Sequence, residues 1–215
     1  MRAMHLGIRH TERRWLASSE LRRLLFLCGY QHSTQRAIHD VLNERGLADL
    51  LDAGTTLAER GITLTIAIPF LRDQHMRERM RREIAARCPR LIVDLQGEIS
   101  TNDLFASHDA FSFPYRNEHA VFVPTSLLEA ISFGIPVVAA DHVMYRDLTH
   151  SAVGPRCSLH RVGDPAHLAS VVAGMQDSYG DSVVRANAAA IDVRGEWTLD
   201  NAVDELLGAL MMSAE

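Results

Sequence analysis

Several features that define common protein classes are missing from this 215-residue sequence. Its three cysteines, Cys28, Cys88 and Cys157, are far apart and odd in number, which argues against a disulfide framework or a zinc site and indicates reduced thiols. No window approaches the roughly 18 apolar residues of a membrane span. Residues 1–15 lack the apolar stretch of a signal peptide. These absences lead us to expect a soluble, cytoplasmic protein.

Sequence motifs for several kinds of active site are also absent. The 11 histidines form no His-Glu-x-x-His motif or paired ligand spacing, and no Asp-x-Asp occurs, so we expect no metal site. No Gly-x-Gly-x-x-Gly, P-loop or Gly-x-Ser-x-Gly is present, which argues against dinucleotide redox enzymes, P-loop enzymes and serine hydrolases. A net charge of -5 and a pI near 6.1 argue against a nucleic-acid partner.

What the sequence does contain is a regular alternation of short apolar runs and longer helical periods. The apolar runs predict strands at residues 24–28, 62–68, 91–95, 110–113, 135–140 and 159–162. Helices are predicted at residues 36–60, with breaks at Gly46 and Gly54, and at residues 71–87, 102–106, 126–133, 165–175, 181–190 and 198–211. Because these strands are continuous apolar runs, they predict a single doubly wound, Rossmann-like α/β fold with a parallel sheet and helices on both faces. Its ligand should bind beyond the carboxyl ends of the strands.

The segment from Pro124 to Asp141 carries the most chemical information. Thr125 is suited to cap a helix, and Ser126 would fall in its first turn. Free amides and the positive end of the helix dipole there suit a phosphate. Glu129 follows Ser126 by three residues on the same helix face, where it could accept two hydrogen bonds from a ribose diol. Phosphate and ribose sites one turn apart match a nucleoside diphosphate.

A structural interpretation of the same residues stays open. Thr125 would cap the helix and Ser126 would fill its first turn. Glu129 would reach back toward the helix start as a capping carboxylate. The local pattern does not decide between a cap and a ligand site.

The longer stretch resembles the donor-binding segment of family-4, group-1 glycosyltransferases, which have the GT-B architecture. The matching elements are Pro124, Leu-Leu-Glu-Ala at 127–130, Gly-Ile-Pro-Val-Val-Ala at 134–139 and Gly-Asp-Pro at 163–165. The similarity extends over most of residues 23–212 and implies one half of a GT-B fold. Residues 21–215 would then form a nucleotide-sugar-binding Rossmann-like domain. Residues 1–20 would be an N-terminal extension or the remnant of an interdomain linker.

The resemblance implies roles for individual residues of the donor site. Glu129 looks like the family glutamate that holds the ribose hydroxyls. The side chains and amides of the helix start would meet the distal phosphate, and the turn after the third strand would border the nucleobase. The residues at the helix start are Thr125, Ser126, Leu127 and Leu128. The residues of the turn are Gln96 and Gly97. No catalytic residue is assigned.

Two departures from the family pattern affect the predicted site. The family usually has a second glutamate eight residues before the first, but that position is Val121 here, and Glu118 is the nearby carboxylate that could replace it. The family also usually has an arginine and a lysine near the first strand, whereas this sequence contains no lysine. The expected replacements are Arg36, Arg72 and Arg116.

The implied function is transfer of a sugar, of hexosyl type, from a nucleoside-diphosphate sugar to an unknown acceptor. The resemblance implies no cofactor and no essential metal, with the helix dipole and arginines stabilising the departing diphosphate. Complete enzymes of this architecture carry the acceptor site in a first domain, so we expect a need for an N-terminal acceptor domain or partner chain. Two alternatives are a non-catalytic nucleotide-sugar-binding or regulatory module, favoured by Val121 and the missing lysine, and a sugar-nucleotide epimerase of the same architecture.

Overall fold

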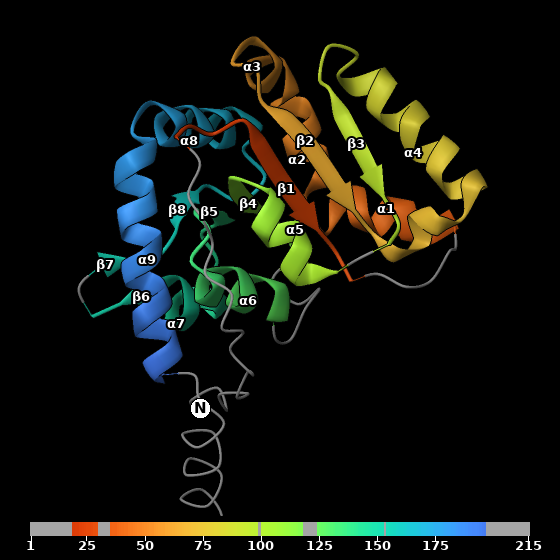
Figure 1. Cartoon of the computed structure of the whole chain (residues 1–215). Coiled ribbons are helices and arrows are strands. Elements are labelled where there is room, and N and C mark those ends of the chain that lie inside the picture. The colour runs from red at the N-terminus through yellow and green to blue at the C-terminus, as the bar shows by residue number, and fades with distance from the viewer. Residues whose placement is uncertain (1–18, 30–34, 99, 118–123, 153, 197–215) are drawn as a thin grey trace, which may run out of the picture.

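A six-stranded parallel sheet organises the chain (Figure 1). The computed structural model describes residues 19–29, 35–98, 100–117, 124–152 and 154–196, and the statements below concern these residues. The strand order is β3-β2-β1-β4-β5-β8, and each ladder in this sheet is parallel. The strands are β1 (Arg23–Leu27), β2 (Thr63–Ala67), β3 (Val93–Gln96), β4 (Ala110–Phe113), β5 (Val137–Ala140) and β8 (Ser158–His160).

Helices cover both faces of the sheet (Figure 1). One face carries α1 (Gln35–Asn43), α2 (Leu47–Asp52), α3 (Gly54–Glu59), α4 (Gln74–Arg87) and α8 (Pro165–Asp177), which contact one another through α2. The other face carries α5 (Thr101–Ser107), α6 (Thr125–Phe133) and α9 (Tyr179–Glu196). The short helices η1 (Pro69–Arg72), η3 (Val143–Tyr145) and α7 (Arg146–Thr149) lie in connections. The prediction of a doubly wound α/β fold is confirmed.

The core forms because the central strands bury side chains on both of their faces. In β1, Leu24, Leu25 and Phe26 are fully buried. Because successive side chains of a strand point to opposite faces, both faces of β1 lie against apolar layers. On one face, the ring of Phe111 in β4 meets Phe105 of α5 edge-on at 5.6 Å between ring centroids. The ring centroids of Phe105 and Phe133, in α6, are 5.7 Å apart. These contacts pack α5 and α6 against β4, beside the point where the strand order reverses.

The structure refines several predicted boundaries. The region 36–60 is three helices, because Gly46 adopts a φ of 70° that ends the first helical run and Gly54 begins α3. Between β5 and β8 the chain forms η3, α7 and a hairpin of β6 (His150–Ser151) and β7 (Gly154–Pro155), none of which was predicted. Two-residue strands are too short to show a period. The helix predicted at 198–211 and most of residues 1–20 lie outside the described residues.

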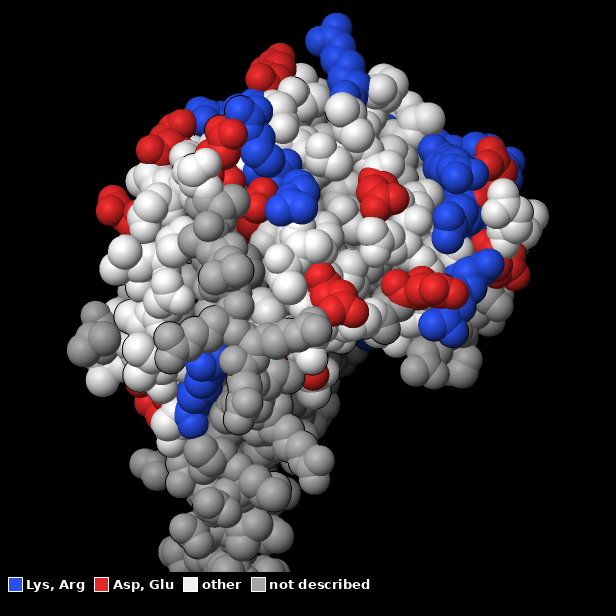
Figure 2. All heavy atoms as spheres, in the orientation of Figure 1, with Lys and Arg blue, Asp and Glu red and all other residues white. Residues whose placement is uncertain are grey.

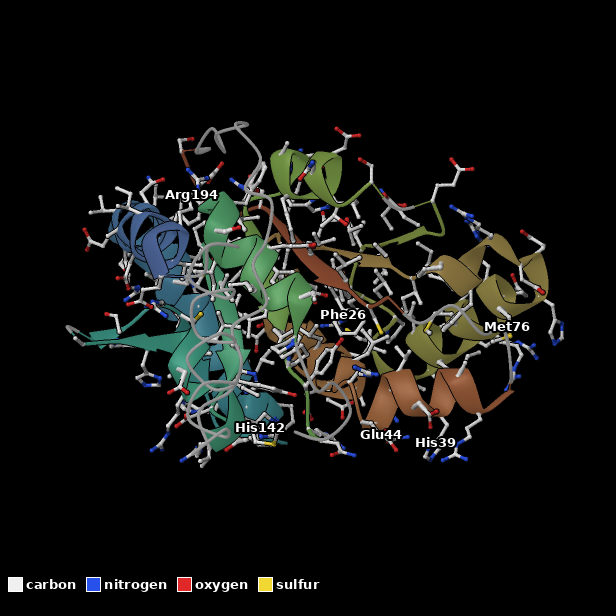
Figure 3. The ribbon with its side chains drawn as sticks, turned by 90° about the horizontal axis from the view of Figure 1, so that it is seen from below. Phe26, His39, Glu44, Met76, His142 and Arg194 are labelled. Atoms are coloured by element: carbon white, nitrogen blue, oxygen red, sulfur yellow. The ribbon has the colours of Figure 1, made fainter. Side chains whose placement is uncertain are left out.

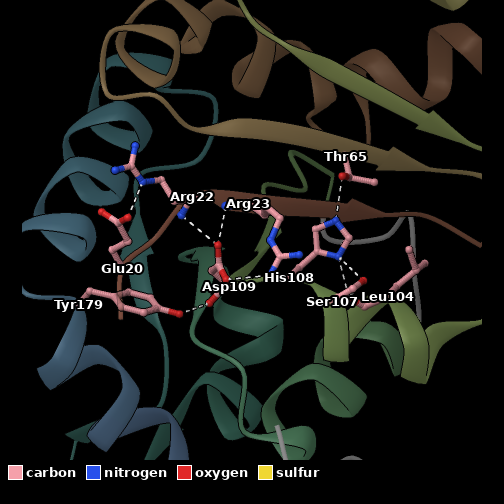
Figure 4. Close-up of polar contacts among 9 residues, drawn as sticks. All are labelled: Glu20, Arg22, Arg23, Thr65, Leu104, Ser107, His108, Asp109 and Tyr179. Carbon is pink, nitrogen blue, oxygen red and sulfur yellow. Dashed lines mark hydrogen bonds and ion pairs between the residues drawn. The ribbon is translucent and has the colours of Figure 1, made fainter. Parts of the chain in front are cut away.

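Polar contacts hold the amino ends of the strands together (Figure 4). The buried carboxylate of Asp109 accepts hydrogen bonds from the amides of Arg22 and Arg23 at 2.9 and 2.7 Å, and the Tyr179 hydroxyl donates to the Asp109 carbonyl at 2.8 Å. His108 Nε2 lies 2.8 Å from Thr65 Oγ1, and burial lowers the pKa of His108. These contacts tie the starts of β1 and β4 to the start of α9.

Candidate functional site

The strand order reverses direction between β1 and β4. From β1 the chain adds β2 and β3 on one side, and from β4 it adds β5 and β8 on the other. In doubly wound folds, ligands bind beyond the carboxyl ends of the strands at such a reversal, so the carboxyl ends of β1 and β4 are where a ligand is expected. The start of α6 follows the β4 loop and belongs to this end of the sheet.

Helix α6 begins one residue earlier than predicted. Pro124 occupies the cap position and makes no side-chain capping bond, and Thr125 is the first helical residue, so the predicted cap at Thr125 is wrong. The Pro124 carbonyl accepts hydrogen bonds from the amides of Leu127 and Leu128, both at 3.0 Å. Those two amides are thus already bonded within the chain. Among the described residues, no acceptor faces the amides of Thr125 and Ser126, which remain suited to an anion.

Glu129 is the charged side chain of α6, and it has no partner among the described residues. All residues of the helix from Leu127 to Phe133 are buried except Glu129, which is half-buried. No hydrogen bond or ion pair joins its carboxylate to any residue within the described ranges, and burial raises its pKa. The capping interpretation is therefore wrong, because the carboxylate does not bond to the helix start.

Thr125 is exposed and Ser126 and Glu129 are half-buried, whereas the remaining residues of α6 are buried. The spacing of one and four residues places Thr125, Ser126 and Glu129 along one side of the helix. The face therefore combines two hydroxyls, two open amides and one unpaired carboxylate. That set can bind an anion at the helix start and a diol one turn further on.

Gln96, Gly97 and Arg72 come together at the carboxyl ends of β2 and β3. Arg72 Nε donates to the Gly97 carbonyl at 3.0 Å. A Cβ at Gly97 would lie 2.4 Å from the Arg72 amide nitrogen, so the close approach of the two backbones requires glycine. Gln96 donates to the Asp94 carboxylate at 2.7 Å. The exposed Arg72 keeps the rest of its guanidinium toward solvent.

The other two predicted arginines differ in their surroundings. Arg36 in α1 is 81% exposed, and its Nε lies 3.7 Å from Asp40. Arg116 instead binds the buried Asp49 through two bonds, one of them Nε to Oδ2 at 2.9 Å, and these bonds raise the pKa of Arg116. The Arg116 guanidinium is therefore already paired within the chain. Glu118 and Val121 lie outside the described residues.

Charged side chains of both signs are mixed over the face seen in Figure 2. Helix α4 carries five arginines and two glutamates, so positive charge predominates along it. In the part of the chain that the structure describes, no three His, Cys, Asp or Glu side chains gather as they would around a metal ion. Within the same part, no helix has the length and apolar character needed to cross a membrane.

Sequence reasoning missed the residues behind the β4 loop. Asp49 is completely buried in α2, and its partner Arg116 is 67 positions further along the chain. His142 Nε2 contacts the Tyr115 carbonyl, and the Tyr115 ring stacks on Phe113 at 3.9 Å. The only local signal is an aspartate among the leucines of the run Leu-Ala-Asp-Leu-Leu, and no spacing connects it to Arg116.

Three solved structures with the same fold have low sequence identity to this chain. Anabaena HepE in complex with UDP-glucose has a TM-score of 0.65 at 16% identity, over 89% of this chain and 49% of that one. A glycosyltransferase from Rickettsia africae has a TM-score of 0.66 at 14% identity, over 89% of this chain and 48% of that one. A mutant of S. aureus TarM in complex with UDP has a TM-score of 0.69 at 10% identity, over 94% of this chain and 38% of that one. This chain thus spans half or less of their length.

A search of curated proteins found no match. The family described as "Glycosyl transferases group 1" matches residues 36–177, which include the whole of the α6 segment. The structural neighbours share the α/β sheet with helices on both faces, as in one half of a GT-B enzyme. The chain therefore belongs to the group 1 glycosyl transferase family.

Proposed function

We propose that this chain binds a nucleoside-diphosphate sugar and forms the donor half of a glycosyltransferase. The observation that carries the proposal is the half-buried carboxylate of Glu129. Within the described ranges it has no partner, and it lies one turn after two amides that have no acceptor there. Buried polar groups are normally hydrogen-bonded, because desolvation without a partner is unfavourable. A ligand with two adjacent hydroxyls and a nearby phosphate would satisfy all of these groups together.

Each part of the donor has a counterpart in the α6 face. The ribose hydroxyls would donate to Glu129, and the distal phosphate would accept from the amides of Thr125 and Ser126 near the positive end of the helix. The turn at Gln96 and Gly97 would border the base. HepE and TarM were solved with UDP-glucose and UDP, which supports a uridine nucleotide as the first ligand to test.

The reaction would transfer a hexosyl group to an acceptor held by an N-terminal domain or a partner chain. When the bond from the sugar to the diphosphate breaks, negative charge builds on the leaving phosphate oxygens. The amide end of α6 and nearby arginines would stabilise that charge without a metal ion or cofactor. Of the three arginines predicted for this role, Arg72 and Arg36 are exposed, whereas Arg116 is paired with Asp49.

Substitution of Glu129 tests the ribose contact. Glu129→Ala should weaken UDP binding by about 1–3 kcal/mol, because the ribose hydroxyls lose a charged acceptor in a partly desolvated site. Titration calorimetry with UDP and GDP would measure the change. Glu83→Ala in α4 is the matched control, since Glu83 is also half-buried but lies on the other face of the sheet. Equal UDP affinity in wild type and Glu129→Ala would refute the ribose role.

A second possible function is binding without catalysis. Val121 at the position of the family's second glutamate, together with the lack of lysine, favours this regulatory module. Both functions predict UDP binding, so the distinguishing measurement is turnover of a UDP-sugar by the full chain, with and without an acceptor half supplied in trans. Binding with no hydrolysis, transfer or epimerisation under either condition would favour the module.

A further inference from the structure

Strand β3 forms an open edge of the sheet, because it ends the strand order and pairs only with β2 among the described strands. The carbonyls of Ile92 and Gln96 accept hydrogen bonds from amides on the β2 side, at 3.0 and 2.9 Å. Successive residues of a strand direct their backbone groups to opposite sides, so the amides and carbonyls of Val93 and Leu95 point away from β2. Within the described ranges, nothing bonds to these outward groups. The edge is therefore able to accept another strand.

A groove of about 350 Å³ lies between this edge and α4, which runs beside β3 (Figure 1). Val93 and Leu95 line the groove from the strand, and Arg77, Arg81 and Ile84 line it from the helix. Both strand residues are half-buried, so the fold leaves part of their apolar surface uncovered. The α4–β3 groove thus combines apolar walls with two guanidinium groups that are one helical turn apart.

The two arginines of the groove retain positive charge that the fold does not neutralise. Arg77 donates through Nε to the Leu71 carbonyl at 3.0 Å and has no acidic partner in the described part of the chain. Arg81 pairs with Glu78 at 3.3 Å, but both side chains are more than half exposed, so this ion pair is weak. The charge therefore favours an anionic occupant. It disfavours a second copy of this chain paired through the same edge, which would bring its own α4 arginines to the groove.

The face of β3 that lies away from the groove sets a second requirement. Ile92 is 70% exposed, and the exposed Asp94 accepts a hydrogen bond from Gln96 at 2.7 Å. These side chains alternate with Val93 and Leu95 along the strand and therefore lie on the other face. A strand added at this edge would cover Ile92 best with an apolar side chain, whereas an acid opposite Asp94 would be repelled.

We propose that the α4–β3 groove binds an extended segment of a partner protein in which acidic and apolar residues alternate. The segment would add to the sheet beside β3, with its acidic side chains on Arg77 and Arg81 and its apolar side chains over Ile92. In this mode of recognition, main-chain hydrogen bonds supply affinity and the alternating side chains supply specificity. A phosphate or a lipid headgroup would pair with the arginines but would not supply the donors that the outward carbonyls of Val93 and Leu95 accept from.

The groove uses residues that are separate from the α6 face. Arg194 of α9 donates to the Ser132 carbonyl of α6 at 2.7 Å, so it marks the side of the molecule that carries α6. Figure 3, which views the molecule from below, labels Arg194 and Met76 of α4 at opposite sides. The inference therefore does not depend on donor binding, and its test needs no nucleotide.

Fluorescence anisotropy of the full chain with labelled eight-residue peptides tests the proposed occupant. In the first peptide valine and glutamate alternate. In the second, glutamine replaces glutamate, and the third is the first with its backbone amides N-methylated. We expect saturable binding of the first peptide and about tenfold weaker binding of the other two, because one lacks the negative charge and the other lacks the backbone donors.

Two charge reversals on α4 locate the binding surface. Arg81→Glu places a negative charge in the groove and should weaken binding of the valine–glutamate peptide about tenfold. Arg82→Glu is the matched control, because it makes the same change in net charge at the adjacent exposed residue, which does not line the groove. Its affinity should stay within about twofold of wild type, since screening weakens the effect of a charge outside the contact.

Equal weakening by the two reversals would mean that overall charge attracts the peptide, and it would overturn the proposal. Binding of the N-methylated peptide as tight as that of its parent would exclude strand addition and point to a simple anion site on α4. No binding of any peptide to the folded wild-type chain would also overturn the proposal. Sedimentation that shows a dimer of the wild-type chain which Arg81→Glu abolishes would identify a second copy as the occupant instead. If Arg81→Glu does not fold, Arg81→Gln makes the same comparison against Arg82→Gln.

Discussion

Two charged side chains, Arg156 and Glu129, show how differently this fold treats partly or fully buried charge. The Arg156 side chain is 2% exposed and is fully occupied: it binds Asp192 at 2.6 Å, Glu196, and the Asp147 carbonyl at 2.9 Å. Glu129 is half-buried and binds nothing within the described ranges. A buried charge whose hydrogen bonds are all filled stabilises the fold, whereas one left open is suited to a ligand.

The two sites also differ in what they connect. Arg156 follows β7 and joins the hairpin and α7 to the last two turns of α9, through acids spaced four residues apart. The Glu129 side chain bonds to no second element in the described part of the chain. The comparison therefore predicts that substitutions at Arg156 change stability without affecting nucleotide binding, and that substitutions around Glu129 do the opposite.

The largest effect should follow from removal of Arg156. Arg156→Ala should lower the free energy of unfolding by about 2–3 kcal/mol, because two carbonyls and two acids lose a buried donor while those acids keep partial access to water. Urea denaturation would measure it. Arg185→Ala is the control, since Arg185 is exposed and bonds only to serine hydroxyls. A loss of UDP affinity in folded Arg156→Ala would break the comparison.

A smaller effect with opposite signs is expected at the start of α6. Ser126→Asp adds a negative charge beside the helix amino end, which should raise folding stability by about 0.3–1 kcal/mol. The same charge should repel a phosphate and weaken UDP binding. Thermal unfolding and UDP titration of one sample would test both signs. Ala166→Asp in the first turn of α8 is the control; it should stabilise similarly and leave UDP affinity unchanged.

The smallest effect concerns the protonation of Glu129. Burial raises its pKa above the usual 4.5, so in the folded state it accepts a proton at a higher pH than in the unfolded state. Below the pKa that Glu129 has in the unfolded chain, the residue is protonated in both states and does not lower the free energy of unfolding. That free energy falls as pH rises through the pKa that Glu129 has in the folded chain. Glu129→Gln removes this loss, and its Tm should slightly exceed that of wild type at pH 7 and match it in acid. Scanning calorimetry across this pH range would measure the difference. A Tm below wild type at pH 7 would mean that the carboxylate stabilises the fold.

Acid should also weaken the nucleotide complex of wild type. A protonated Glu129 accepts fewer hydrogen bonds from a diol, so UDP affinity should begin to fall at a higher pH than it would for an ordinary glutamate. In Glu129→Gln the affinity should be lower and should lack this dependence. Parallel slopes for the two proteins would exclude Glu129 as the titrating group.

Much of the fold follows from local sequence, whereas the site depends on distant contacts. Apolar runs such as the one at β2 are strong signals for buried parallel strands, and they predicted the doubly wound sheet. The start of α6 was misplaced by one residue because Thr125 is a good cap by type, while the actual cap position is occupied by proline. The pairing of Asp49 with Arg116 could not be predicted, since nothing in either local sequence specifies a partner 67 positions away.

The network around Asp109 has a consequence for how this domain can diversify. Its bonds to the start of β1 and to Tyr179 lie at the amino ends of the strands, away from the α6 face. Under the proposed function, this network and the ligand site lie at opposite ends of one sheet. Loops at the carboxyl pole can exchange residues, and even change specificity, while the opposite pole keeps the strands aligned.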